Sequence, residues 1–226
     1  MCAAEVAPNG ICQLVVRRPP GGAILPCLSN SWKVDSHSVR KHSTCRAIPV
    51  ATAIIAAIAL TLLTAFATAQ AAVPSLRLVL AGDGPGRPAA EALAGTLGIV
   101  DRITWAGWVS NLADFYAALD IFALSSVNEG TPVAAIEAMA ASLPVISTAV
   151  GGVPDVVEHG ASGLLAPSGD VEGLADALVR LASDAALRRA MGLTGRQRAL
   201  THYSHRRLVD DMEALYVSRL ARKRGG

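Results

Sequence analysis

Short apolar runs alternate with segments of helical periodicity from residue 76 to residue 219. The apolar runs are bounded by glycine, proline or polar residues, which is typical of strands that are buried on both faces. The segments between them carry apolar residues three and four positions apart, as helices do. The predicted strands cover 76–82, 103–105, 121–124, 144–148 and 163–166. The predicted helices cover 88–97, 111–119, 132–141, 154–158, 171–182, 185–200 and 205–219.

This alternation predicts an α/β fold: a doubly wound parallel sheet with helices on both faces and further helices at the C-terminal end. Parallel sheets of this kind bind ligands at the carboxyl ends of their strands, where the connecting loops meet. A functional site is therefore expected among four loops, 82–86, 106–110, 125–131 and 149–154.

Residues 47–76 contain no charged side chain, which leaves three interpretations open. The run is long enough to span a bilayer, and the basic residues before it favour a membrane segment over 47–73. It also resembles the core of a signal peptide, although the 46 residues before it are more than such a peptide has. The third interpretation is a short strand, a turn and a buried helix that ends near Val73 and Pro74.

Residues 1–46 show no sustained period and are predicted to be irregular, apart from a short strand at 13–16. All four cysteines lie in this stretch, and because their spacing matches no zinc or redox motif we expect unpaired thiols. The folded domain is predicted over 47–220, and 221–226 form a basic tail. The net charge of +2 does not indicate a nucleic-acid partner.

The segment around Thr131 predicts a helix N-terminus that faces the strand ends. Thr131 is suited to cap the helix and Pro132 to its first turn. The first amides of such a helix are free and lie at the positive end of its dipole, so they form an anion site. Gly130 would let an anion approach the backbone closely. We expect the face made by Val133, Ile136 and Ala140 to pack inward.

Two glutamates lie on either side of this helix start. Glu129 precedes the helix, and Glu137 lies about one and a half turns inside it. Carboxylates accept hydrogen bonds from sugar hydroxyls, so the pair suits a ligand that carries hydroxyls beside its phosphates. The alternative is that Glu129 only favours the helix dipole and that Glu137 is solvated.

The motifs around this pair resemble the donor-binding half of retaining GT-B glycosyltransferases of family 4. The glutamates with seven residues between them match the signature of that family, and the resemblance covers about three quarters of the chain. Several motifs in order are far more specific than any one of them. They are AGDGP (81–85), ITWAGWV (103–109), IFALSS (121–126), EGTPVAAIEAMAASLPVIST (129–148) and GGVPDVVEHGASGLLAPSGD (151–170).

The resemblance implies a role for each matching position. Glu137 is similar to the glutamate that holds the ribose of the nucleotide, and Glu129 corresponds to the candidate catalytic glutamate near the hydroxyls of the donor sugar. The loop at Val109 corresponds to the one that touches the base. The remaining donor-binding candidates are the backbone groups of Gly84, Gly130, Thr131, Pro132 and Val133, of which Pro132 offers no N–H.

The sequence departs from the family pattern in three places. An arginine and a lysine that stabilise the leaving diphosphate in the family align with Thr52 and Ala57. The usual glutamate after the Gly-Gly-x-Pro motif is Asp155. The preceding acceptor domain of full-length relatives has no counterpart in the first 49 residues. The same alignment interprets 47–76 as strand, loop and helix.

The resemblance implies a retaining hexosyltransferase that takes a UDP- or GDP-sugar as donor, without a metal or another cofactor. We expect a truncated donor-binding half. The alternatives are a nucleotide-sugar-binding module that works with an acceptor-domain partner chain, or a non-functional remnant. The acceptor would be a sugar or a lipid-linked acceptor. We expect a cytoplasmic protein, because the chain after residue 45 has no cysteine and needs no disulfide, with membrane association as the alternative. The arginines over 188–207 are interpreted as a solvated face, with a membrane surface as the alternative.

Overall fold

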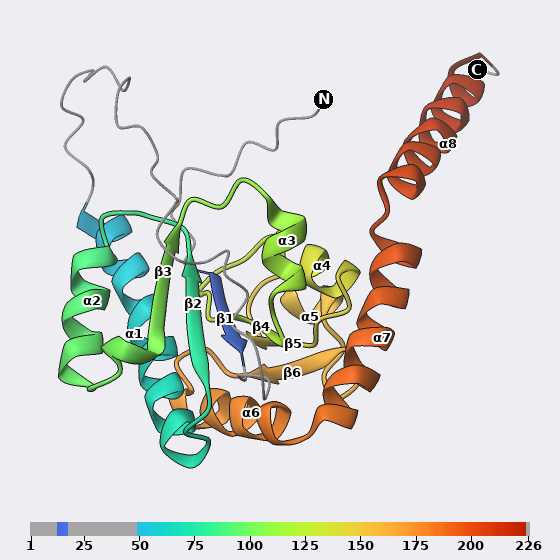
Figure 1. Ribbon diagram of the computed structural model, residues 1–226. Helices are drawn as coiled ribbons and strands as arrows, with labels where there is room; N and C mark the ends of the chain where they lie inside the picture. Colours follow the sequence, from blue (N-terminus) through green and yellow to red (C-terminus); the bar gives the residue numbers. More distant parts are fainter. Residues whose placement is uncertain (1–12, 18–48, 225–226) are drawn as a thin grey trace.

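The computed structural model describes residues 13–17 and 49–224, and the strands in these ranges form one six-stranded sheet (Figure 1). Helices cover the sheet on both faces, so the predicted α/β class is confirmed. The order across the sheet is β3-β2-β1-β4-β5-β6. The strands are β1 Gln13–Arg17, β2 Arg77–Ala81, β3 Ile103–Gly107, β4 Ile121–Leu124, β5 Val145–Thr148 and β6 Gly163–Ala166.

Strand β1 differs from the rest of the sheet in direction. It lies between β2 and β4 and is antiparallel to both, with Val15 opposite Val79 on one side and Phe122 on the other. The remaining pairs, β2–β3, β4–β5 and β5–β6, are parallel as predicted. An apolar run does not encode the direction of its strand, because both kinds of ladder satisfy the backbone N–H and C=O groups.

The helices begin and end within a few residues of the predicted positions from residue 87 onward. They are α2 Arg87–Thr96, α3 Leu112–Ala117, α4 Val133–Ala140, α5 Val153–Val156, α6 Val171–Ser183, α7 Ala185–His202 and α8 His205–Arg224, with a short 3₁₀ turn at Val100–Arg102. Helix α8 continues to Arg224, so it includes most of the predicted basic tail.

Helix α1 corrects the expectation of a strand, a loop and a helix over 47–76. It runs unbroken from Pro49 to Ala72. The segment is rich in alanine, the best helix former, and contains no glycine. Proline suits its first turn, and Pro74 follows its end. Leu62, Leu63 and Phe66 are buried against the sheet and α6. None of the described helices is both long and apolar enough to cross a bilayer.

Alternation of side chains along the strands produces two cores, one on each face of the sheet. In β4, Ile121 and Ala123 pack with α1, α2 and α6, while Phe122 and Leu124 pack with α3, α4 and α5. Figure 1 shows these two groups of helices on opposite sides of the sheet. A strand that is covered on both faces has to be apolar throughout, which explains why its sequence does not alternate.

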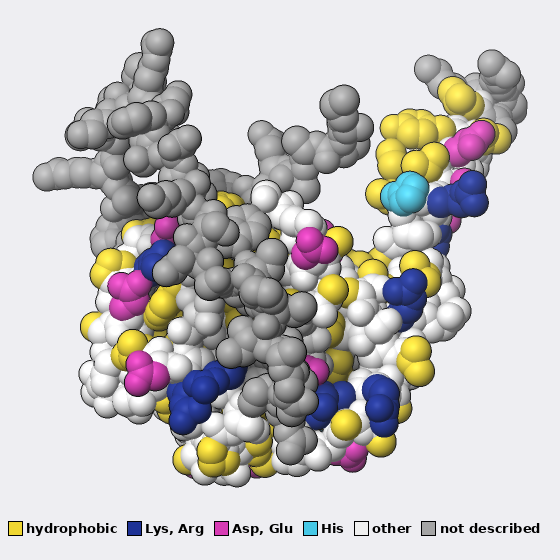
Figure 2. Space-filling view, viewed as in Figure 1, with side chains coloured by type: hydrophobic (Ala, Val, Ile, Leu, Met, Phe, Trp, Pro, Cys, Tyr) yellow, Lys and Arg dark blue, Asp and Glu magenta, His cyan; other side chains and the backbone are white. Residues whose placement is uncertain are grey.

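Helix α8 projects away from the body of the molecule (Figure 1). Its described side chains are all exposed. Figure 2 shows hydrophobic side chains gathered along α8 next to charged ones. This surface therefore has no packing partner among the residues that the structure describes. Its large apolar side chains are Leu208, Val209, Met212, Leu215, Tyr216, Val217 and Leu220.

Candidate functional site

The loop between β4 and α4 is fixed by hydroxyl groups at the strand ends. Ser147 donates a hydrogen bond to the carbonyl of Leu124 at 2.9 Å, and Thr148 donates to the carbonyl of Ser126 at 2.5 Å. Both donors are buried at the end of β5. A buried hydroxyl needs a partner, and here the partner is the backbone of the neighbouring strand end. The loop that carries Glu129 is therefore held firmly at its beginning.

Glu129 is held at the carboxyl ends of the strands by both its side chain and its backbone. Ser126 donates its hydroxyl to Glu129 Oε1 at 2.5 Å. The Gly152 N–H donates to the Glu129 carbonyl at 3.1 Å, which joins the loop after β4 to the turn after β5. The carboxylate itself is half-buried. This position agrees with the prediction that Glu129 precedes the helix at the mouth of the site.

The Gly151-Gly152 turn packs directly against the backbone of the Glu129 loop. A Cβ atom on Gly151 would lie 1.8 Å from the Glu129 carbonyl oxygen, and one on Gly152 would lie 2.1 Å from that of Gly130. Gly151 also has a φ of +50°, in the region that disfavours residues with a side chain. Both glycines are therefore required for the close approach of the two loops.

Helix α4 starts one residue later than predicted, and its buried face differs from the predicted one at Val133. Pro132 is its N-cap residue and no side chain caps it, so the expected cap by Thr131 is wrong. Val133 is 61% exposed, so its expected inward position is wrong, while Ile136 and Ala140 are partly buried against the core as expected. The buried residues are Ala135, Ala138 and Met139, and the two alanines let α4 lie close to the sheet.

Glu137 is bound by a residue that the sequence did not indicate. Tyr116 of α3 donates its hydroxyl to Glu137 Oε2 at 2.9 Å. Tyr116 is 4% exposed, and its burial raises the pKa of its phenol, with the charge of Glu137 adding to the shift. The phenol therefore stays protonated and keeps donating. The only indication of Tyr116 in the sequence is that it is an aromatic residue in the predicted 111–119 helix. Packing in the core would explain an aromatic residue there equally well.

Gly84 and Val109 lie in the loops after β2 and β3, apart from the glutamate loop. The Gly84 N–H donates to Asp83 Oδ1 at 2.9 Å. The two loops are joined where the Gly82 N–H donates to the Gly107 carbonyl at 2.7 Å. Val109 packs against the core that contains Phe115 and Tyr116 of α3. In the sheet order, β1 separates β2 from β4, so these two candidates lie on the far side of β1 from Glu129.

Arginines of α7 hold the ends of other helices. Arg188 donates to the carbonyls of Leu181 and Ala182 at the end of α6, and Arg196 donates to that of Ala140 at the end of α4. A guanidinium suits a helix C-terminus because the last carbonyls are free and lie at the negative end of the dipole. Arg196 is exposed, as expected of a solvated face, and Arg188 is half-buried, but both also bind the end of a helix, which the sequence did not indicate.

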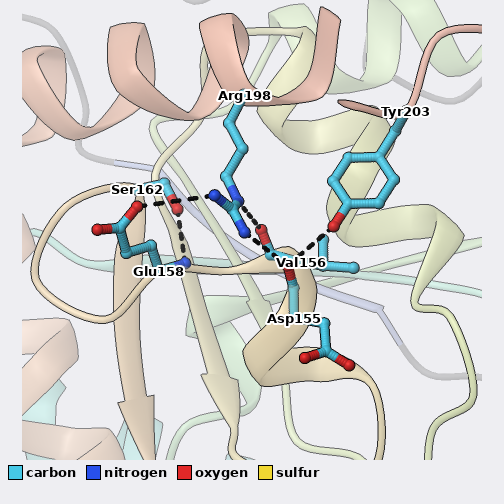
Figure 3. A network of polar contacts seen from close by, with 6 residues as sticks. All are labelled: Asp155, Val156, Glu158, Ser162, Arg198 and Tyr203. Carbon is cyan, nitrogen blue, oxygen red and sulfur yellow. Dashed lines mark hydrogen bonds and ion pairs between the residues drawn. The ribbon is translucent and has the colours of Figure 1, made fainter. Parts of the chain in front are cut away.

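Arg198 has the same role at the end of α5 (Figure 3). Its Nε donates to the Val156 carbonyl at 2.9 Å and its Nη2 to the Asp155 carbonyl at 2.7 Å. The hydroxyl of Tyr203 donates to the same Asp155 carbonyl at 2.8 Å. Glu158 lies 3.7 Å from Arg198 as an ion pair. The C-terminal end of α5 is thus bound by Arg198 of α7 and by Tyr203, the residue that follows α7.

Two surface hollows lie away from the predicted site: one of about 490 Å³ along α7, and one of about 380 Å³ beside the amino ends of β4 and β5. Neither is lined by Glu129 or Glu137. Among the residues that the structure describes, no three His, Cys, Asp or Glu side chains gather as a metal site would need.

Comparison with known proteins identifies similar sequences and structures. Residues 57–184 match the family described as Glycosyl transferases group 1. The N-acetyl-alpha-D-glucosaminyl L-malate synthase of Bacillus anthracis is 35% identical over 66% of this chain and 39% of that protein. The GDP-mannose-dependent alpha-(1-6)-phosphatidylinositol monomannoside mannosyltransferase of Mycobacterium tuberculosis is 34% identical over 61% of this chain and 38% of that protein.

A solved structure shows the same fold. Sucrose-phosphate synthase from Thermosynechococcus elongatus is 32% identical with a TM-score of 0.65, over 71% of this chain and 43% of that one. The fold of this chain is therefore that of one Rossmann-like half of a GT-B glycosyltransferase. The chain spans about two fifths of the length of each of these relatives.

Proposed function

Because the chain belongs to the glycosyl transferases group 1 family, we propose that it binds a nucleotide sugar as the donor-binding half of a retaining glycosyltransferase of family 4. The observation that carries the proposal is the pair of glutamates on either side of the N-terminus of α4. Glu129 and Glu137 are both half-buried, and each is oriented by a hydroxyl donor. Carboxylates held in this way favour a ligand with several hydroxyl groups.

Glu137 is suited to bind the ribose of the nucleotide. Tyr116 donates to Oε2 only, which leaves Oε1 to accept a hydrogen bond from a hydroxyl of the ligand. This hydrogen bond also restrains the Glu137 side chain, so the carboxylate is oriented before the nucleotide arrives. This preorganisation lowers the entropic cost of binding.

Glu129 would lie beside the donor sugar, and the first amides of α4 beside the diphosphate. Ser126 donates its hydroxyl to Oε1 of Glu129, so Oε2 can accept a hydrogen bond from a sugar hydroxyl. The amides at the start of α4 have no acceptor within the helix, and Gly130 leaves open space before them. This arrangement supports an anion site that needs no metal.

The proposed reaction transfers the sugar with retention to a sugar or a lipid-linked acceptor. The bond between the anomeric carbon and the diphosphate breaks, and a bond from that carbon to the acceptor oxygen forms on the same face. The proton of the acceptor hydroxyl leaves with the diphosphate. Thr52 and Ala57 stand at the positions where the family carries its cations, and their side chains lie outside the part that the structure describes. Cations from the acceptor half would then have to stabilise the leaving group.

The acceptor half would be supplied by a partner chain or by a longer form of this one. The exposed apolar side chains of α8 favour such a partner. Exposing a large apolar surface to water is unfavourable, and such surfaces are typical of protein interaction sites. We propose that the protein is cytoplasmic and uses nucleotide sugars there. If its acceptor is lipid-linked, the protein would instead work at a membrane surface.

Calorimetric titration of UDP and GDP into the purified chain tests donor binding. We expect one nucleotide to bind, and Glu137→Ala to weaken its binding about tenfold, because a charge-assisted hydrogen bond is lost. The matched control is Glu172→Ala, which removes an exposed glutamate from the first turn of α6. Equal affinities of both variants, or a folded chain that binds neither nucleotide, would reject the proposal and favour a non-functional remnant.

A further inference from the structure

We propose that Arg198 of α7 is a positioning residue for Glu129, acting through α5 and the Gly151-Gly152 turn. This inference rests on the proposed role of Glu129 beside the donor. Arg198 and Glu129 are on different elements, and a short helix lies between them. The chain of contacts has three links, each of which consists of hydrogen bonds or direct backbone packing.

The first link joins α7 to the C-terminal end of α5. The guanidinium of Arg198 donates to two successive carbonyls, those of Asp155 and Val156, at 2.7 and 2.9 Å (Figure 3). Tyr203 adds a third donor at 2.8 Å, again to the Asp155 carbonyl. Three donors therefore converge on the last carbonyls of one short helix. The guanidinium is a planar fork, so it fixes the direction of the helix end as well as its distance.

The second link is α5 itself, which depends on its neighbours for its position. It contains four residues, fewer than an isolated helix needs to be stable. No side chain caps its N-terminus at Gly152. Val153 and Val156 are buried and anchor one side of it. The contacts from Arg198 and Tyr203 supply the other constraint, because they hold the polar end that the two valines do not hold.

The third link joins α5 to the Glu129 loop. The residue that starts α5, Gly152, donates its N–H to the Glu129 carbonyl at 3.1 Å. Gly151 packs so closely that an added Cβ would lie 1.8 Å from the same oxygen. Two backbones in such close contact move together, because packed interiors do not deform freely. A shift of α5 would therefore displace Glu129.

Arg196 provides a matched comparison on the same helix. It also donates its guanidinium to a helix C-terminus, through a hydrogen bond of 2.6 Å to the Ala140 carbonyl. That carbonyl lies at the end of α4 farthest from the Glu129 loop. Loss of Arg196 thus removes an interaction of the same kind without releasing α5. A general loss of stability would affect both variants, whereas a positioning effect would appear only at Arg198.

The test compares Arg198→Met with Arg196→Met in the whole chain. Methionine keeps much of the apolar stem and removes all donors. We measure the hydrogen exchange rate of the Gly152 amide by NMR and the affinity for UDP-glucose and GDP-mannose by calorimetry, because Glu129 would contact the sugar of the donor. We expect Arg198→Met to speed exchange at Gly152 about tenfold and to weaken binding of the nucleotide sugar about tenfold, with Arg196→Met within about twofold of wild type in both.

Two further variants keep the test decisive. Arg198→Lys retains the charge but not the fork and should recover part of the affinity, and Tyr203→Phe should cost about twofold to threefold because one donor of three is lost. If Arg198→Met does not fold, these two variants provide the same comparison with Arg196→Met. Equal exchange at Gly152 in the Arg198 and Arg196 variants would overturn the inference. If wild type binds no nucleotide, the proposed function fails, and exchange at Gly152 still decides the positioning role.

Discussion

The two glutamates of the candidate site are held in place by different means. Glu129 lies in an irregular loop, and its backbone is fixed by groups from β5 and from the Gly151-Gly152 turn. Glu137 lies inside a regular helix, and one side chain, Tyr116, orients it. A loop residue depends on backbone contacts that many substitutions cannot preserve. A helical residue depends on a single pair of side chains, which is easier to change without loss of the fold.

Gly151→Ala should have the largest effect, because it disrupts the loop contact directly. The new Cβ would lie 1.8 Å from the Glu129 carbonyl oxygen, at a residue whose φ is +50°. We expect the free energy of unfolding to fall by about 3 kcal/mol, measured by urea denaturation. Gly160→Ala is the control, since Gly160 has a φ of +82° with nothing within 4 Å. The free energy of unfolding of Gly160→Ala should fall by only about 1 kcal/mol. Equal losses would show that the contact with the Glu129 loop is unimportant.

Tyr116→Phe tests the helical glutamate in the same way. It removes the hydroxyl that donates to Glu137 Oε2 and preserves the ring. Because the bond is charge-assisted but the carboxylate can still reach water, we expect a loss of about 1.5 kcal/mol in the free energy of unfolding. Tyr216→Phe removes a hydroxyl from an exposed ring of α8 and should change nothing. A loss confined to Tyr116→Phe would confirm that one side-chain pair orients Glu137.

Alkaline pH should reduce the stability that the same interaction gives to wild type, because tyrosine ionises more readily in the unfolded chain. An unfolded tyrosine titrates near pH 10, and burial together with Glu137 raises the pKa of Tyr116 above that value in the folded chain. Above about pH 10 the unfolded state binds fewer protons, so stability falls as pH rises, while below it the contribution is complete. The difference between wild type and Tyr116→Phe should shrink by about 1.4 kcal/mol per pH unit there. A constant difference from pH 8 to pH 11 would contradict this expectation.

Ser126→Ala should have the smallest effect of the series. It removes the hydroxyl that donates to Glu129 Oε1 and leaves the backbone contacts of the loop in place. We expect the free energy of unfolding to fall by about 0.5–1 kcal/mol in thermal unfolding. Ser218→Ala on exposed α8 is the control. A loss as large as that of Gly151→Ala would mean that side chains, and not backbone packing, hold the loop.

Two predictions differ from the structure for reasons that lie outside the local pattern. Among the three interpretations of 47–76, the family alignment favoured a strand, a loop and a helix, but the alanine-rich segment forms one helix. In α4, Ile136 and Ala140 pack against the core as predicted, whereas Val133 at the start of the helix is exposed. Which side of a helix is covered depends on the elements that pack against it.

The sequence by itself determined the elements from residue 76 onward, the α/β class with a mainly parallel sheet, and the glutamates on either side of the start of α4. Apolar runs and helical periods are properties of neighbouring residues, so they can be read along the chain. Only the tertiary structure decided the direction of β1 and the contacts that orient the site. Tyr116 reaches Glu137 across 21 positions and Arg198 reaches Asp155 across 43. Such contacts depend on which elements become neighbours, and a local pattern carries no information about that.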